Sequence, residues 1–207
     1  NIPLRLGLAG SSAIITACFK ALQQFFSIRF TPELQANLVL SVETKELGIA
    51  AGLQDRVAQA FEQPVFMDFN RNYMLEHGYG KYEHLPVDQL PPFYIAYRRN
   101  LSEGSENTHN NLKARFEIGD PVVLAAMQQW ANLTEQFREA MDTRDYRRMH
   151  DLMNANFDLR RKVISISPGN LDMVELARST GASAKFTGSG GAIIGTYSGE
   201  AMYENLK

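Results

Sequence analysis

The sequence predicts an α+β fold, because helical and strand patterns both recur along the chain. Apolar residues follow the three- and four-residue spacing of amphipathic helices in several segments, whereas short alternating segments indicate strands. The chain has 207 residues, of which 44% are hydrophobic and 21% charged, a composition typical of globular proteins. It is therefore long enough to bury a sizeable core in one large or two small domains.

The first half of the chain is expected to begin with three helices. Residues 12–26 form the first, because apolar residues recur at helical spacing and Ser11 or Ser12 offers an N-cap. The second opens with a threonine cap followed by proline and glutamate and ends near a glycine. This second helix begins at Thr31 and ends near Gly48. The third begins at Gln54 and ends at Phe61.

Four short segments are expected to form strands. Residues 65–69 (VFMDF) and 93–97 (FYIAY) alternate, while residues 184–186 and 192–197 flank a glycine-rich segment. The polar residues 70–89 between the first two are expected to be a loop or hairpin.

The second half is expected to be mainly helical. Residues 121–141 and 146–163 form two long helices separated by a polar break, hence a helical hairpin. A shorter helix covers residues 171–180, and another starts at Gly199. The polar, turn-rich residues 101–111 are expected to form a surface loop.

The charge balance and the apolar pattern exclude several classes of function. With 21 Lys and Arg against 23 Asp and Glu, the net charge is −2, without the basic surplus expected of a nucleic-acid-binding protein. No run of about 18 apolar residues indicates a membrane span. The single Cys18 rules out an intrachain disulfide and a cysteine-based zinc site. We expect a cytoplasmic protein without nucleic-acid or membrane partners; the sequence leaves its oligomeric state open, a monomer included.

A first glycine-rich segment leads directly into the first expected helix. Small residues let a backbone approach a ligand closely, and a helix N-terminus presents unpaired N–H groups and the positive end of its dipole. The segment therefore indicates a phosphate site, with two adjacent hydroxyls that could bind phosphate or Mg²⁺. A serine-capped turn is the alternative that this segment alone leaves open. Its residues are Gly7, Leu8, Ala9, Gly10, Ser11, Ser12 and Ala13.

A second glycine-rich segment lies between two expected strands near the C-terminus. Three glycines within four positions exceed what a hairpin needs, which indicates that the backbone passes close to a ligand. A glycine-rich hairpin is the alternative. Neither segment matches the P-loop, dinucleotide or hydrolase-elbow patterns. The residues of this second segment are Gly188, Ser189, Gly190 and Gly191.

Two carboxylates flank a small-residue turn at residues 48–53, with Glu43 before it and Asp55 after it. Phosphoryl transfer needs a metal ligand and a group that orients the attacking hydroxyl. A partly buried Asp55 is a candidate general base. The alternative is that Glu43 belongs to a solvated charge pair on a helix and that Asp55 is a helix cap. Composition alone favours that alternative.

Taken together, these segments resemble the GHMP kinases, the family of galactokinase, homoserine kinase, mevalonate kinase and phosphomevalonate kinase. Residues 7–13 (GLAGSSA) resemble the nucleotide-binding motif of that family, and residues 185–192 (KFTGSGGA) resemble its C-terminal glycine-rich motif. Residues 52–59 (GLQDRVAQ) point to a sugar-acid branch, the glucuronokinases, with support from residues 90–97 (LPPFYIAY) and 153–162 (MNANFDLRRK). The resemblance covers most of the chain.

The resemblance implies ATP-dependent phosphorylation of a sugar, with Mg²⁺ and with the anomeric hydroxyl of D-glucuronate as the expected acceptor. It implies that residues 7–12 wrap the triphosphate and that residues 188–191 border the same phosphates. Ser12 and Glu43 would bind Mg²⁺, and Asp55 would be the base or orienting group. Two neighbours, Arg56 and His109, have no assigned role. The alternatives are another sugar kinase of the family, of heptose, fucose or galactose type, and a non-catalytic binding protein with the same fold.

The resemblance also implies a two-layer architecture. Residues 1–69 are expected to be the remainder of an N-terminal ATP-binding domain like domain 2 of ribosomal protein S5. Residues 70–207 are expected to form a C-terminal α/β sandwich, incomplete at its end. The usual family loop, Gly-Leu-Gly-Ser-Ser-Ala, is one residue shorter than the loop here. Strands and a first motif that precede this loop in the family are missing, so we expect little turnover from the 207-residue chain alone.

Overall fold

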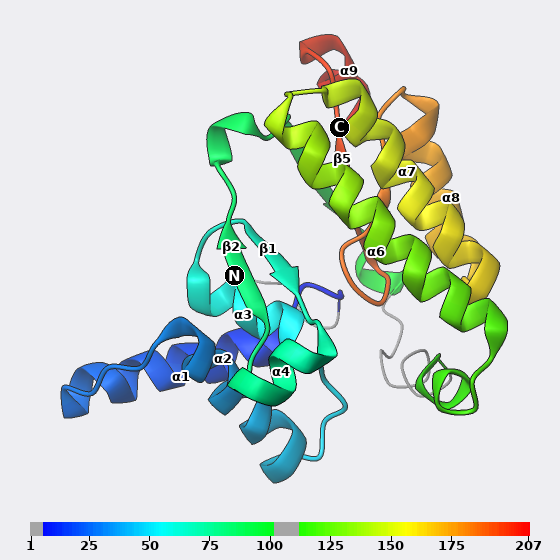
Figure 1. The fold of residues 1–207 in the computed structure, drawn as a ribbon. Coiled ribbons are helices and arrows are strands. Elements are labelled where there is room, and N and C mark those ends of the chain that lie inside the picture. The colour runs from blue at the N-terminus through cyan, green and yellow to red at the C-terminus, as the bar shows by residue number, and fades with distance from the viewer. Residues whose placement is uncertain (1–5, 102–111) are drawn as a thin grey trace. The chain divides into compact units, whose positions relative to one another are not determined.

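The computed structural model describes residues 6–101 and 112–207, and its helices and short strands confirm the predicted α+β class (Figure 1). The chain divides into two compact units, one of which is Ala9–Asp88. The other comprises residues 89–207 together with those that precede Ala9. The division that the family resemblance predicts, between residues 69 and 70, stays a prediction.

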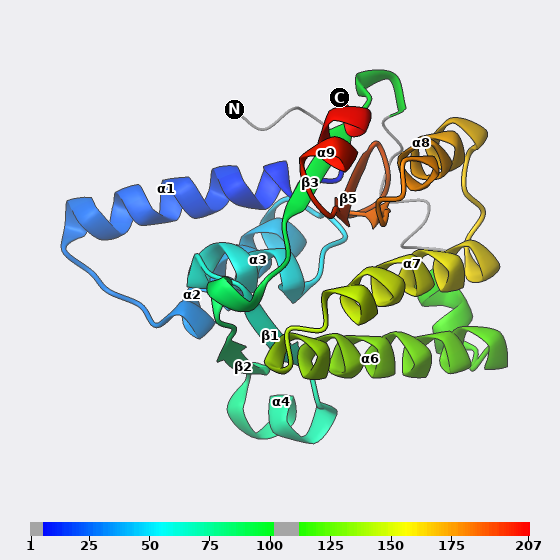
Figure 2. The same ribbon diagram turned by 90° about the horizontal axis from the view of Figure 1, so that it is seen from above.

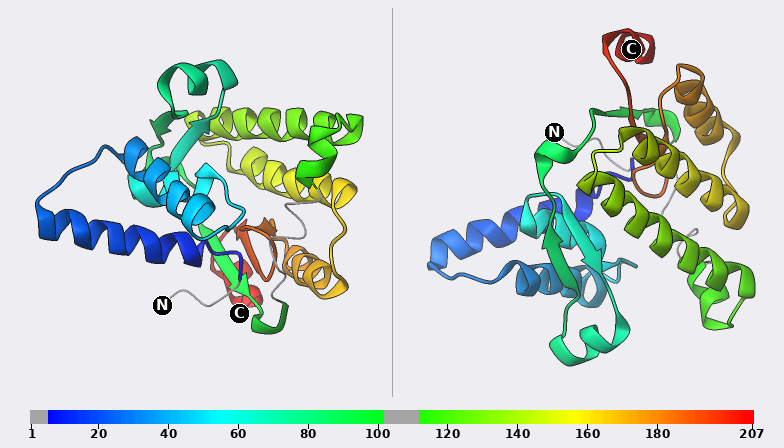
Figure 3. Two further views of the ribbon diagram at one scale, coloured as in Figure 1. Left: turned by 90° about the horizontal axis from the view of Figure 1, so that it is seen from below. Right: turned by 45° about the horizontal axis from the view of Figure 1, so that its top comes forward.

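Three α-helices and a π-helical turn form most of the Ala9–Asp88 unit. Thr31 caps the second helix as predicted, because its hydroxyl accepts a hydrogen bond from the Leu34 N–H at 3.3 Å. The second helix packs against the third, and the first contacts both (Figure 3). These elements are α1 (Gly10–Phe26), α2 (Pro32–Ser41), η1 (Val42–Glu46) and α3 (Leu53–Phe61).

A hairpin completes this unit. Strand β1 (Val65–Asp68) pairs in antiparallel fashion with β2 (Lys81–His84). The connection contains a helix, α4 (Arg71–His77), whose N-cap is Asn70; the short 3₁₀ turn η2 (Val87–Gln89) follows β2. The hairpin agrees with the prediction for residues 70–89, whereas the helix within it was not predicted.

The second unit is built on a small antiparallel sheet with the strand order β3-β5-β4. The strands are β3 (Phe93–Tyr97), β4 (Lys185–Phe186) and β5 (Ala192–Thr196), close to the predicted bounds. Tyr94 is paired with Gly195 in the central ladder. A β-carbon at Gly195 would lie 1.7 Å from the Ser183 carbonyl oxygen, so the close approach of these two backbones requires glycine.

Helices supply the rest of this unit. Helices α6 (Pro121–Asp142) and α7 (Tyr146–Val163) lie side by side and confirm the predicted helical hairpin (Figure 2). Helix α8 (Pro168–Ser179) begins three residues before its predicted start. This unit also contains the 3₁₀ turn η3 (Arg99–Leu101) and α9 (Glu200–Leu206), and residues 112–117 are helical as well. His109 and the loop predicted beyond Leu101 lie outside the described residues.

The core of the second unit lies between α7, α8 and the sheet. Its members are buried apolar side chains, together with the Tyr94 ring. They are Tyr94, Phe157, Met173, Val174, Ala177, Ala182, Ala184, Phe186 and Ile193. Because α8 and the strands share this core, the segment joining β4 to β5 is anchored on both sides.

Helix α1 buries an unexpected face. The apolar residues that predicted this helix are largely exposed, including Phe25 at 79% and Ile14 at 64%, whereas Ser12 and Thr16 are buried. The helical spacing was therefore predicted correctly, but the face that contacts α3 is polar. That polar face organises the candidate site described below.

Burial of Tyr94 predicts a loss of stability at high pH. Burial raises the pKa of Tyr94 from 10.0 to about 12, against an opposing effect of Arg178, and its hydroxyl donates to the Ser183 carbonyl at 2.7 Å. The folded chain therefore keeps the phenol protonated where the unfolded chain ionises. The associated stability is fully present below pH 10 and is lost as the pH rises through about 12.

Urea unfolding at a series of pH values between about 9 and 12 tests this linkage. The wild-type free energy of unfolding should fall more steeply with pH than that of Tyr94→Phe, which has no ionisable phenol at this position. Parallel pH dependences would show that Tyr94 does not titrate differently in the folded and unfolded chains.

Candidate active site

The first glycine-rich segment ends as the N-terminus of α1. Helix α1 begins at Gly10, and the residue before it, Ala9, has a left-handed φ of 54°. Within the described residues no side chain caps this helix, so the predicted cap at Ser11 or Ser12 is wrong. Since the first amides of a helix have no intrahelical partner, the N–H groups at Gly10 to Ser12 can bind an anion. The amide of Ala13 already donates to the Ala9 carbonyl at 3.1 Å.

The hydroxyl of Ser12 is part of a buried polar network rather than an exposed ligand. Ser12 is fully buried, and its hydroxyl donates to the Ala9 carbonyl at 3.0 Å. Gln59 on α3 donates from Nε2 to both the Ser12 oxygen, at 2.9 Å, and the Ala9 carbonyl, at 3.1 Å. Thr16 donates in turn to Gln59 Oε1 at 3.1 Å. Helix α3 thus fixes the left-handed residue and the first turn of α1 through one glutamine.

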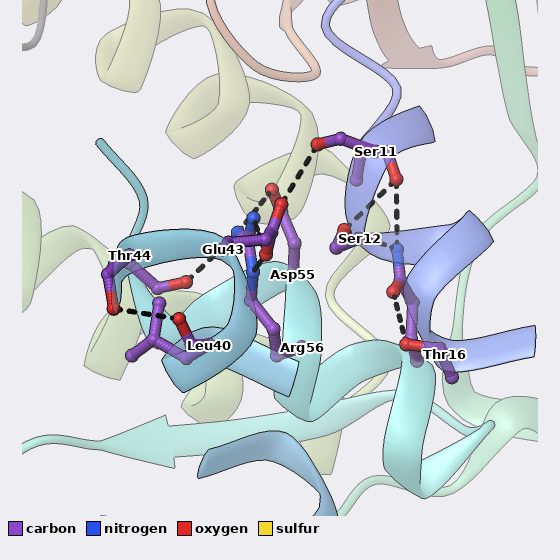
Figure 4. A network of polar contacts seen from close by, with 11 residues as sticks. Ser11, Ser12, Thr16, Leu40, Glu43, Thr44, Asp55 and Arg56 are labelled. Atoms are coloured by element: carbon purple, nitrogen blue, oxygen red, sulfur yellow. Dashed lines mark hydrogen bonds and ion pairs between the residues drawn. The ribbon is translucent and has the colours of Figure 1, made fainter. Parts of the chain in front are cut away.

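Glu43 lies beside the other hydroxyl of the segment (Figure 4). Ser11 Oγ donates to Glu43 Oε1 at 2.9 Å, and Arg56 forms a salt bridge with Glu43 Oε2. Glu43 is fully buried and Arg56 is 6% exposed. The solvated charge pair considered as an alternative is therefore wrong, because a buried carboxylate is held by a hydroxyl and a guanidinium.

Asp55 is presented to solvent next to this buried pair. Its side chain is 54% exposed, and Oδ2 lies 3.3 Å from a terminal nitrogen of Arg56. Gly52 is the N-cap of α3, so Asp55 stands in the first turn and is not the cap. The structure thus brings Asp55 and Glu43 together through Arg56. A carboxylate that is accessible but held in place can meet the hydroxyl of a bound substrate.

The second glycine-rich segment closes against Gly7. A β-carbon at Gly188 would lie 2.5 Å from the Gly7 carbonyl oxygen, and Thr187 Oγ1 donates to that oxygen at 3.1 Å. Gly190 and Gly191 adopt φ values of 144° and 80°, which L side chains rarely adopt. The bend at residues 6–8, which includes the half-buried Leu8, therefore packs directly on residues 187–191.

Asn170 on α8 is hydrogen-bonded to the backbone of this second segment. The Asn170 side chain is fully buried, and its Oδ1 accepts from the Gly191 N–H at 2.8 Å. Its Nδ2 donates to the Leu101 carbonyl at 3.3 Å. Lys185 precedes the segment on β4; burial lowers its pKa, Arg160 lowers it further, and its ammonium donates to the Phe186 carbonyl at 3.2 Å. Ser189, in contrast, is half-buried in the bend itself.

The two adjacent serines are expected to affect stability differently. Replacing Ser12 by alanine should lower the free energy of unfolding by about 1–3 kcal/mol, because Gln59 Nε2 loses a buried acceptor. Replacing the exposed Ser11 should change it by less than about 0.5 kcal/mol. Urea denaturation of both variants measures the difference. Equal losses would contradict the division of roles between the two hydroxyls.

The oxygens of Glu43 and Ser11 are compatible with a magnesium ion. Mg²⁺ prefers oxygen ligands in octahedral geometry and commonly takes one or two carboxylates. Neighbouring ligands about 2.0–2.1 Å from such an ion lie about 2.9 Å apart, and the Ser11 and Glu43 oxygens are separated by 2.9 Å. In the described part of the chain, no three acidic, histidine or cysteine side chains gather into a metal site of their own. Any ion held here would therefore take its remaining ligands from water or from a bound molecule.

Sequence reasoning missed Gln59 as a residue of the site and left Arg56 without a role. Both lie on the inner face of α3, three residues apart, which is the spacing of neighbours on a helix. That spacing was readable in the GLQDRVAQ segment, but nothing in the sequence indicated that a polar helix face would be buried.

Among the described residues, no helix has the length and apolarity needed to cross a bilayer.

Comparison with known proteins places this geometry in a family. The model of the GHMP kinases N terminal domain matches residues 1–63, and the GHMP kinases C terminal model matches residues 137–207. A probable glucuronokinase 2 of Arabidopsis thaliana is 44% identical over 200 residues, and glucuronokinase 1 of the same plant is 42% identical over 199. Each alignment covers 94% of this chain but 54% of the relative.

The chain thus spans about half the length of the curated relatives it matches. A solved structure of mevalonate kinase from L. major superposes with a TM-score of 0.74 at 19% identity, covering 96% of this chain and 59% of that one. At this identity the superposition supports the fold alone. With both family models aligned in the expected order, the chain belongs to the GHMP kinase family.

Proposed function

We propose that the whole protein is an ATP-dependent kinase that phosphorylates the anomeric hydroxyl of a sugar acid, with D-glucuronate as substrate. The observation that carries the proposal is the buried Glu43 carboxylate, held between Ser11 at the start of α1 and Arg56 beside Asp55. Such a cluster has little value for folding alone, because burying an ion pair costs about as much as it gains. The glucuronokinases among its relatives supply the substrate class. The proposal includes a cytoplasmic location.

The backbone amides are proposed to bind the triphosphate. The N–H groups at Gly10, Ser11 and Ser12 and the dipole of α1 favour negative charge at that helix end. The bend at residues 188–191 is held open by two glycines in left-handed conformations, so no β-carbon obstructs a phosphate there. Each group is held by hydrogen bonds within its own part of the chain, the first through Gln59 and the second through Asn170.

Asp55 is proposed to orient the attacking hydroxyl and to accept its proton. The anomeric oxygen forms a bond to the γ-phosphorus while the bond from that phosphorus to the β-bridging oxygen breaks, and ADP leaves. The hydroxyl proton passes to the Asp55 carboxylate. The nearby Arg56 guanidinium holds Asp55 in place, since its terminal nitrogen lies 3.3 Å from Oδ2.

Mg²⁺ fits the proposal through Glu43 and a serine hydroxyl. Ser11 stands beside Glu43 in this structure, and Ser12 is the ligand that the family resemblance implies. When bound, the ion would neutralise charge on the phosphate oxygens. In this arrangement Glu43 and Ser11 are the residues that would hold it, because the Ser12 hydroxyl is buried against Ala9 and Gln59.

A panel of sugars assayed with ATP tests the proposed function in the whole protein. D-glucuronate is expected to give the highest kcat/KM, with galactose, fucose and a heptose phosphate as competitors. A clear preference for one of these would replace the sugar acid by another substrate of the family. Absence of transfer to any sugar, with ATP still bound, would favour a non-catalytic binding protein.

A further inference from the structure

We infer that Arg56 is a positioning residue that makes the Glu43 site select Mg²⁺ over Ca²⁺. The inference rests on the proposed function, because it concerns the same site. It comes from the contacts of the Arg56 guanidinium, which occupy one oxygen of the buried Glu43 carboxylate and leave the other beside Ser11.

Arg56 is held on three sides. Its Nε and one terminal nitrogen both bind Glu43 Oε2. The other terminal nitrogen donates to the Gly52 carbonyl at 3.0 Å and contacts Asp55 Oδ2 at 3.3 Å. With the side chain 6% exposed, the planar fork cannot turn away from Glu43 without leaving a buried charge unpaired.

This arrangement leaves Glu43 with one oxygen to offer a cation. Oε2 is occupied by two N–H donors, whereas Oε1 faces the Ser11 hydroxyl at 2.9 Å. Ca²⁺ takes about six to eight oxygens and often binds both oxygens of a carboxylate, whereas Mg²⁺ is octahedral and accepts a single carboxylate oxygen readily. Occupying Oε2 therefore disfavours Ca²⁺ more than Mg²⁺.

Binding of a non-hydrolysable ATP analogue, AMPPNP, to the whole protein tests the inference. Its Kd is measured by calorimetry with Mg²⁺, with Ca²⁺ and with a chelator. Wild type should bind the Mg²⁺ complex at least about tenfold more tightly than the Ca²⁺ complex, a difference of about 1.4 kcal/mol. Arg56→Gln should reduce that ratio by about fivefold or more, because Oε2 is freed, and Arg56→Lys should lie in between.

The matched control is Arg148→Lys, which alters an ion pair with Glu139 on the partly exposed surface of α6 and α7. It should leave the ratio unchanged. Thermal unfolding of each variant reports folding; if Arg56→Gln does not fold, the ratio for Arg56→Lys, which retains a cation for Glu43, decides. A ratio within about twofold of wild type in the folded Arg56 variants would overturn the inference.

Failure of the proposed function gives a different result. Absence of phosphate transfer to any sugar would reject the kinase function, whatever the cation ratio. Wild-type AMPPNP binding that is the same with either cation and with the chelator, and that Glu43→Gln does not alter, would instead reject the metal site on which the inference rests. The role of Arg56 is rejected separately, when wild type prefers Mg²⁺ and the Arg56 variants keep that preference.

Discussion

Replacing Asp55 by asparagine is expected to lower kcat for sugar phosphorylation by about 10²–10⁴-fold, the usual contribution of a positioned acid–base group. The amide keeps the size of the side chain but cannot accept the hydroxyl proton. Because Asp55 is 54% exposed and makes a single ion-pair contact with Arg56, folding should be little affected. Steady-state kinetics should show the loss in kcat, with the KM for ATP within a small factor of wild type.

Asp151→Asn is the matched control, since Asp151 is an exposed aspartate on α7, outside the candidate site. Its kcat should equal that of wild type. If Asp55→Asn turned over at the wild-type rate, Asp55 would have no catalytic role, and the general base would have to be sought elsewhere. A lowered Tm together with the lost rate would instead mean that the contact with Arg56 supports the fold.

Replacing Gly188 by alanine is expected to weaken ATP binding by at least about tenfold, or about 1.4 kcal/mol. The added β-carbon would lie 2.5 Å from the Gly7 carbonyl oxygen and 3.2 Å from two further backbone atoms of Gly7. Backbone atoms cannot move aside as a flexible side chain can, so the two glycine-rich bends must separate. Overpacking of this kind also lowers stability by about 1–3 kcal/mol. Calorimetric titration with AMPPNP measures the first effect and urea unfolding the second.

Gly52→Ala is the matched control, because a side chain added at this glycine would meet no neighbouring atom. Its φ is −125° and no heavy atom lies within 4 Å of the added β-carbon, so stability and AMPPNP affinity should stay near wild type. An unchanged affinity in Gly188→Ala would show that the contact between Gly7 and Gly188 does not shape the nucleotide site.

Most helices and strands were predictable because their signals are local. Proline or threonine at a helix start and glycine beyond a helix end act within one or two turns, and α2 and α6 begin where these residues indicate. Helix α4 was missed, since its seven residues carry little periodic apolar signal and its Asn70 cap resembles any polar turn.

The candidate site was harder to predict, because its geometry depends on which helix faces meet. Ser11 and Ser12 are adjacent in sequence but point to different partners, Glu43 and Gln59. The left-handed φ of Ala9 starts α1 without a side-chain cap, which sequence propensity disfavours for alanine. Burial of Glu43 likewise follows from Arg56, 13 residues later, and not from any local pattern. Tertiary pairing decided each of these features.

A crystal structure of the whole protein with AMPPNP and Mg²⁺ tests the central claim most directly. The expected result has the phosphate oxygens hydrogen-bonded to amides at Gly10–Ser12 and at residues 188–191, with the ion on Glu43 and a serine hydroxyl. A nucleotide bound away from these amides, or a metal ion that does not contact Glu43, would contradict it.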